Sequence, residues 1–148
     1  ASNLEKVNEE LSTKVKAAAA LKTGNVFVVP LRVRNSGKET DVSRASTAKK
    51  LRVNFNVVNN SIAEKGMHEI YMRIIDPNGN LMITDNGSMF IVDDEELQYT
   101  YKTAVEFAND GKTYTIDWTN PESFQKGTYT IVLYADGYTM GRGEVTLK

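Results

Sequence analysis

Residues 128–147, TYTIVLYADGYTMGRGEVTL, decide the fold, because they contain two strand-like segments joined by a two-residue turn. Asp136-Gly137 is a dipeptide that favours the left-handed backbone of a tight hairpin turn. The flanking segments, Thr128–Ala135 and Tyr138–Leu147, are rich in threonine, tyrosine and valine and contain no proline. This stretch therefore predicts an antiparallel β-hairpin at the end of the chain.

Two central segments extend the β pattern toward the N-terminus. Leu51–Val58 (LRVNFNVV) alternates apolar and polar residues, which is typical of a strand with one face on a core. Its apolar members are Leu51, Val53, Phe55 and Val57. Met67–Ile75 reads as a further strand, and Asp76-Pro-Asn-Gly-Asn80 after it is a strong turn signal. Both segments predict strands of an antiparallel sheet.

The second half of the chain has more short β segments. Met89–Val92 predicts a short strand, followed by an acidic connection at Asp93–Glu96. We interpret that acidic run as a solvated turn. Gln98–Phe107 and Lys112–Trp118 flank an Asn-Asp-Gly turn, and this arrangement predicts a second hairpin.

The first β segment and the loop after it complete the pattern. Asn25–Arg34 reads as a strand, and Pro30 places it at a sheet edge or a bulge because proline cannot donate a ladder hydrogen bond. Asn35–Lys50 is almost wholly polar and predicts a long loop. About eight or nine short strands without helices between them predict a mainly β domain over residues 25–148, an antiparallel β-sandwich of immunoglobulin-like type.

Residues 1–24 differ in period from the rest of the chain and predict one N-terminal α-helix. Apolar residues recur at steps of three and four, which places them on one stripe: Leu4, Val7, Leu11, Val15, Ala18 and Leu21. We expect the helix to run from Leu4 to about Lys22 and to stop at Gly24. Isolated helices of this length are marginal in water, so the stripe must pack on something.

Two partners for this stripe remain open. As a fragment of a coiled-coil stem it would make the protein a homodimer, although Lys14 falls on a core position of the heptad. The alternative is that it packs against its own β domain. Because the chain starts at Ala1 rather than at methionine, we expect further sequence upstream.

Composition excludes several kinds of chemistry. The chain has no cysteine, which removes disulfides, thiolate metal sites and cysteine nucleophiles. His68 is the single histidine, so a site with several histidine ligands is impossible, and we interpret this residue as structural. The net charge of −1 provides no global field for nucleic acid. We expect no enzyme activity, no cofactor and no metal.

Two surfaces are candidates for partner binding. The stretch from Arg32 to Arg52 has a local excess of positive charge, and it predicts a basic partner surface made of Lys38, Arg44, Lys49, Lys50 and Arg52. Aromatic residues for base stacking are missing there, which disfavours nucleic acid. Exposed rings would instead suit sugar stacking, and this alternative rests on Tyr99, Tyr101 and Trp118. Aromatic residues are also standard core and sheet stabilisers.

Several segments resemble a family of uncharacterised Bacteroidetes envelope proteins with a coiled coil and a C-terminal β-sandwich domain. The similar segments are SGKE at 36–39, LRVNFNV at 51–57, GMHEIYMRIIDPNGNLM at 66–82 and GTYTIVLYADGYTMGRGEVTLK at 127–148. The resemblance implies a membrane anchor upstream, a coiled-coil stem and a domain displayed in the periplasm. It implies no catalytic residues.

The expected function is a non-enzymatic interaction or scaffold module of the bacterial cell envelope. In this hypothesis the β-sandwich is a binding head, the helix is a dimerising stem, and an unknown protein is the partner. The alternative is a carbohydrate-binding module that uses exposed aromatic residues. The membrane would be reached only through the upstream anchor.

Overall fold

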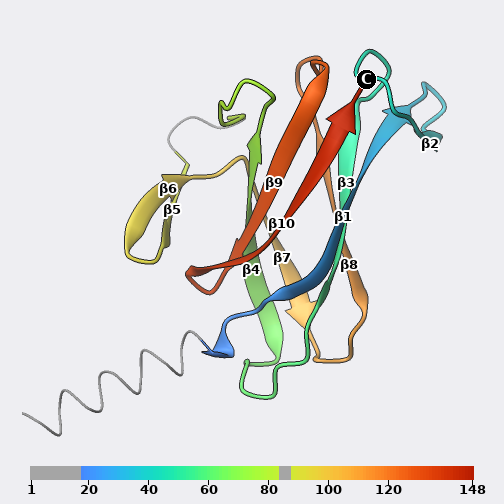
Figure 1. Cartoon of the computed structure of the whole chain (residues 1–148). Coiled ribbons are helices and arrows are strands. Elements are labelled where there is room, and N and C mark those ends of the chain that lie inside the picture. The colour runs from blue at the N-terminus through green and yellow to red at the C-terminus, as the bar shows by residue number, and fades with distance from the viewer. Residues whose placement is uncertain (1–17, 84–87) are drawn as a thin grey trace, which may run out of the picture.

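The computed structural model describes residues 18–83 and 88–148, and its architecture is mainly β (Figure 1). The strands in chain order are β1 (Thr23–Val33), β2 (Glu39–Asp41), β3 (Lys50–Val57), β4 (Gly66–Ile75), β5 (Met89–Val92), β6 (Glu95–Gln98), β7 (Tyr101–Phe107), β8 (Thr113–Thr119), β9 (Gly127–Ala135) and β10 (Tyr138–Leu147). No helix in the described part of the chain is long and apolar enough to cross a membrane.

Two four-stranded antiparallel sheets form the body of the domain. One sheet has the order β2-β1-β3-β8 and the other β10-β9-β4-β7, while β5 and β6 form a separate two-stranded sheet. The two larger sheets stack as layers of a β-sandwich, and the small hairpin stands beside β4 (Figure 1). Their facing sides supply one continuous apolar core.

Alternation along the central strands sends their apolar residues into this core. β3 buries every second residue, which confirms the strand predicted from LRVNFNVV, and Phe55 is 1% exposed. β4 and β9 contribute fully buried residues from the opposite sheet, among them Ile70 and Leu133. Burial of each such side chain stabilises the fold by about 1.5–3 kcal/mol.

The predicted β9–β10 hairpin is confirmed. Ala135 pairs with Tyr138 across a two-residue turn in which Asp136 and Gly137 have φ values of 57° and 82°. β10 also passes close to β1 at the side of the sandwich. A Cβ atom at Gly143 would lie 2.8 Å from Cγ1 of Val26, so glycine is needed for this approach. The close contact holds the two sheets together along that side.

The second hairpin predicted for the later strands is wrong. β7 and β8 do not form a hairpin, because β7 pairs with β4 and β8 pairs with β3. The connection between them passes from one sheet to the other, with Asn109 and Gly111 at positive φ. The acidic run at 93–96 does contain the predicted solvated turn, and its last two residues, Glu95 and Glu96, begin β6. Asp93 and Asp94 form the turn of the β5–β6 hairpin, with φ values of 48° and 64°.

The predicted long loop contains a short strand. β2 pairs with the end of β1, Leu31 opposite Asp41. Pro30 lies just before this pairing begins and faces Leu51 of β3 on the other side. The backbone carbonyl of Pro30 accepts a hydrogen bond from the N–H of Val42, which lies just beyond β2. The backbone nitrogen of Pro30, which has no hydrogen to donate, therefore points away from β3. The hydrogen bonds between β1 and β3 are unaffected.

Only the end of the predicted N-terminal helix lies within the described residues. Leu4, Val7, Leu11 and Val15 lie outside the described residues, while Ala18 and Ala19 have helical backbone and Ala18 is exposed. The predicted end at Gly24 is wrong, because β1 begins at Thr23 and Gly24 lies within it. Placing Leu21 on an oligomer stripe is also wrong, because its side chain is 0% exposed and belongs to the domain's own core.

Hydrogen bonds attach this N-terminal junction to the sandwich. The side-chain amide of Asn60 donates to the carbonyl oxygen of Ala18 at 2.9 Å, and the Leu21 N–H donates to Asp136 Oδ2 at 3.3 Å. Lys22 Nζ donates to the carbonyl oxygen of Thr139 at 2.8 Å. Residues 18–22 are therefore fixed on the β3–β4 connection and on the β9–β10 hairpin.

Candidate functional site

The β5–β6 hairpin packs on the outer face of the β10-β9-β4-β7 sheet through a second apolar cluster. Phe90 stacks on Tyr71 of β4 with ring centroids 4.6 Å apart, and it contacts Tyr134 of β9 edge-on at 5.1 Å. The tip is also fixed, because the Asp93 N–H donates to the carbonyl oxygen of Gly137 at 3.0 Å. The hairpin is thus held as a wall above the sheet.

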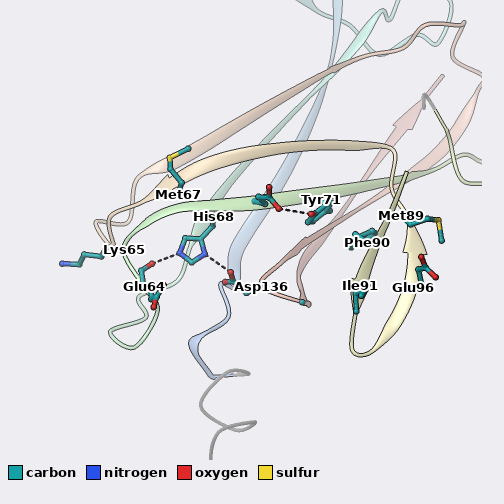
Figure 2. A pocket seen from close by; sticks show the side chains of 12 residues that line it. Glu64, Lys65, Met67, His68, Tyr71, Met89, Phe90, Ile91, Glu96 and Asp136 are labelled. Carbon is teal, nitrogen blue, oxygen red and sulfur yellow. Dashed lines mark hydrogen bonds and ion pairs between the residues drawn. The ribbon is translucent and has the colours of Figure 1, made fainter. Parts of the chain in front are cut away.

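A groove of about 660 Å³ lies between this wall and the start of β4 (Figure 2). Three large apolar side chains line it and are exposed: Met67 at 68%, Met89 at 44% and Ile91 at 66%. Large exposed apolar residues gathered in one concave place indicate an interaction surface rather than a scatter of single exposed residues.

Carboxylates are interspersed with these apolar residues. Glu69 accepts a hydrogen bond from the Tyr71 hydroxyl at 2.9 Å and pairs with Lys102 at 3.2 Å, and these two contacts lower its pKa. Glu64 and Glu96 also line the groove, and their carboxylates form no ion pair within residues 18–83 and 88–148. The groove is therefore both apolar and acidic.

His68 lies at one end of the groove with both ring nitrogens engaged. Nε2 is 2.6 Å from the backbone oxygen of Glu64, and Nδ1 is 2.9 Å from Oδ1 of Asp136. A carbonyl oxygen only accepts, so Nε2 must carry a proton. Burial disfavours the charged ring, but the contacts with Glu64 and Asp136 outweigh it and raise the pKa of His68. The ring links the β4 start to the β9–β10 turn, and its two contacts favour the protonated form.

This arrangement leaves His68 without a free lone pair for general-base chemistry. Asp136 is similarly committed, because its second oxygen accepts the Leu21 N–H. In the described part of the chain no group of three or more histidine, aspartate or glutamate residues is placed to hold a metal ion.

Residues 24–148 match the model of one family, Domain of unknown function (DUF8428). The chain belongs to the DUF8428 family. The matched range begins within β1 and contains all the remaining strands, the groove and the β5–β6 hairpin. No curated protein and no solved structure matches the chain.

The predicted basic surface is smaller in the structure. Lys50 and Arg52 belong to an ion-pair network on the outer face of the β2-β1-β3-β8 sheet, in which both contact Glu39 and Asp117. Hydrogen bonds from Arg52 and Lys50 lower the pKa of Asp117, although burial opposes them. Including these two residues in a free basic surface was wrong, because β3–β8 pairing places Asp117 opposite Arg52.

The other predicted basic residues remain available. Lys38, Arg44 and Lys49 are exposed, and none of them forms an ion pair within the described ranges 18–83 and 88–148. Lys49 lines a shallow pocket of about 340 Å³ together with Arg32 and Thr47. Lys38 and Arg44 do not line this pocket, and the carboxylate of Glu122 does, so it is a weaker site than the apolar groove.

The three predicted stacking rings do not form one platform. Trp118 is 3% exposed and packs edge-on against Phe124 in the core, so assigning it to sugar stacking was wrong. Its inward position follows from pairing with Leu51 of β3. Tyr99 is partly buried against Tyr71 in the hairpin cluster. Tyr101 alone among the three is exposed, at 37%, on strand β7.

The groove itself was not predicted from the sequence, although one signal points to it. Met89–Val92 is a run of four apolar residues instead of an alternating segment. Phe90 and Val92 are buried on the sheet, while Met89 and Ile91 face outward and are exposed. A short strand that is apolar on both faces indicates that each face has a partner.

Proposed function

We propose that this protein is a non-enzymatic interaction or scaffold module of the bacterial cell envelope, with the β-sandwich as its head. The observation that carries the proposal is the concave groove with exposed Met67, Met89 and Ile91. Surfaces that combine exposed apolar residues with a polar rim are typical of partner binding. The commitment of His68 to Asp136 and Glu64 favours binding over catalysis.

We infer that the sandwich is of the immunoglobulin-like type. The order β1-β3-β8 facing β10-β9-β4 corresponds to strands A-B-E facing G-F-C in that fold. A further hallmark of the fold is a tyrosine near the start of strand F that hydrogen-bonds to backbone a few residues upstream. Tyr129 in β9 supports this, because its hydroxyl accepts the N–H of Gln125 at 2.8 Å.

The stem and its location belong to the same proposal. The apolar stripe of Leu4, Val7, Leu11 and Val15 would pair with a second copy of the chain and make a homodimer. An upstream anchor would then hold the head in the periplasm. Light-scattering mass measurement tests the stem, and a strict monomer at high concentration would exclude it.

A glycan-binding module is the alternative proposal. It now depends on Tyr101, because Trp118 is buried and Tyr99 packs in the hairpin cluster. Titration with oligosaccharides while tyrosine fluorescence is recorded would test it. A Tyr101→Ala variant that binds sugar as well as the parent chain would remove this alternative.

The main proposal is tested by site-specific photo-crosslinking in cells that make the full-length protein. A benzophenone side chain replaces Met67 in one strain and Phe27 in another. Phe27 is a matched control, since it is 63% exposed on β1, in the sheet away from the groove. We expect a discrete crosslinked partner from Met67 and none from Phe27. Equal crosslinking at both positions would contradict the proposal.

A further inference from the structure

A ligand that fills the groove meets two kinds of side chain, exposed apolar residues and carboxylates. Its opposite walls expose Met67 and Ile91, and burial of such side chains drives association. Beside them stand the carboxylates of Glu64 and Glu96, which form no ion pair among the described residues. A carboxylate that loses water without gaining a cation carries a large free-energy cost. A ligand that fills the groove therefore needs apolar and cationic groups together.

Negative charge dominates the wall formed by the hairpin. Glu96 belongs to a run of four consecutive acidic residues, 93–96, all of them exposed. The basic residues that line the groove are Lys65 and His68, and His68 contacts Asp136. This field attracts a basic partner and repels an acidic one.

The groove is also held open before any partner arrives. The Asp93 N–H to Gly137 bond fixes the hairpin tip, and Arg73 Nε donates to the carbonyl oxygen of Gln98 at 2.9 Å on its second strand. A preformed site avoids the cost of ordering on binding. The two methionines in the walls add adaptability, because their unbranched side chains fit varied apolar shapes.

We propose that the groove binds a basic amphipathic polypeptide segment of a partner protein. Large apolar side chains of that segment pack between Met67 and Ile91, while its lysine or arginine side chains pair with Glu64 and Glu96. The volume of about 660 Å³ suits a few side chains of an extended segment rather than a folded domain. This inference rests on the function proposed above and specifies the chemistry of its partner.

Peptide titration with the full chain tests the proposal. The probe is a fluorescein-labelled peptide of alternating lysine and leucine, and its binding is followed by fluorescence anisotropy. One comparison peptide has glutamate in place of lysine, and the other has serine in place of leucine. We expect the lysine–leucine peptide to bind about tenfold or more tightly than either, because each comparison removes one of the two required contacts. Its affinity should fall as salt is raised.

Variants with matched controls locate the binding site. Ile91→Ser should weaken binding about tenfold, and Glu96→Lys about two- to fivefold. The controls are Phe27→Ser, which removes an equally exposed apolar residue, and Glu144→Lys, which reverses a carboxylate that is 55% exposed on β10. Both controls should bind like the parent chain.

The outcomes separate this inference from the function it rests on. If the glutamate peptide binds as tightly as the lysine peptide, and Ile91→Ser weakens both, the groove binds partners but the proposed basic chemistry is wrong. If Phe27→Ser and Ile91→Ser weaken binding equally, the peptide adheres nonspecifically and the inference is overturned. If no peptide binds and Met67 gives no crosslink, the interaction function fails as well.

Discussion

Leu21 provides a quantitative test of how the N-terminal segment joins the domain. Its side chain is 0% exposed and lies in the core cluster, although sequence periodicity placed it on an oligomer stripe. Replacement of a buried leucine by alanine costs about 2–5 kcal/mol, and we expect about 3 kcal/mol for Leu21→Ala. In a domain of this size each kcal/mol lowers Tm by about 2–4 °C, which gives a fall of roughly 6–12 °C.

Fluorescence of Trp118 during thermal unfolding measures this effect. Trp118 is the single tryptophan and is 3% exposed, so its emission reports opening of the core. Ile62→Ala is the control, because Ile62 is 54% exposed and its removal should change stability by less than about 0.5 kcal/mol. An unchanged Tm for Leu21→Ala, together with a lower mass in light scattering, would refute the reasoning and return Leu21 to the oligomer stripe.

Three further predictions concern other contacts of the sandwich. The raised pKa of His68 stabilises the fold below the pKa of an unfolded histidine, about 6.5, and this contribution is lost as pH rises through the folded pKa. His68→Gln should therefore cost more stability at pH 5.5 than at pH 9 in urea unfolding, and Asp136→Asn should follow the same trend; a larger cost at pH 9 would contradict the assignment. Gly141→Ala should lower the free energy of unfolding by about 1–3 kcal/mol, because the added Cβ would collide with the Thr23 hydroxyl. Thr23→Ala should restore part of this loss in the double variant. If chemical denaturation shows that the two effects are additive, the contact is not the cause. Tyr129→Phe removes the hydroxyl that accepts a backbone N–H and should cost about 1 kcal/mol, measured as the urea midpoint, whereas an unchanged midpoint would argue against a structural hydrogen bond.

The sequence predicted the elements whose signals are local. Alternation over Leu51–Val58 places its apolar residues on one face whatever the neighbouring strands are, and β3 has this pattern of burial. The Asp136-Gly137 turn is similarly determined by two adjacent residues with positive φ. These features depend on backbone preferences within a few residues, and they needed no knowledge of the tertiary structure.

The candidate site depends on contacts between distant parts of the chain, which local patterns do not contain. Asp117 neutralises Arg52 across 65 residues, so a stretch that is basic in sequence is balanced in the folded sheet. The Asn-Asp-Gly turn after Phe107 looks like a hairpin signal, but the strands beside it pair with β4 and β3. Choice of strand partner follows the most favourable burial of both faces, not the nearest segment in sequence.

By itself, the sequence determined that this chain builds short antiparallel strands with one apolar face, because side-chain alternation and turn chemistry are properties of neighbouring residues. Tertiary structure alone decided which strands share a sheet and that the β5–β6 hairpin stands over β4. The groove with Met67 and Ile91 on opposite walls arises from that placement. The physical reason that the sequence does not reveal this groove is that Phe90 and Tyr71 stack only once the hairpin has folded back onto the sheet.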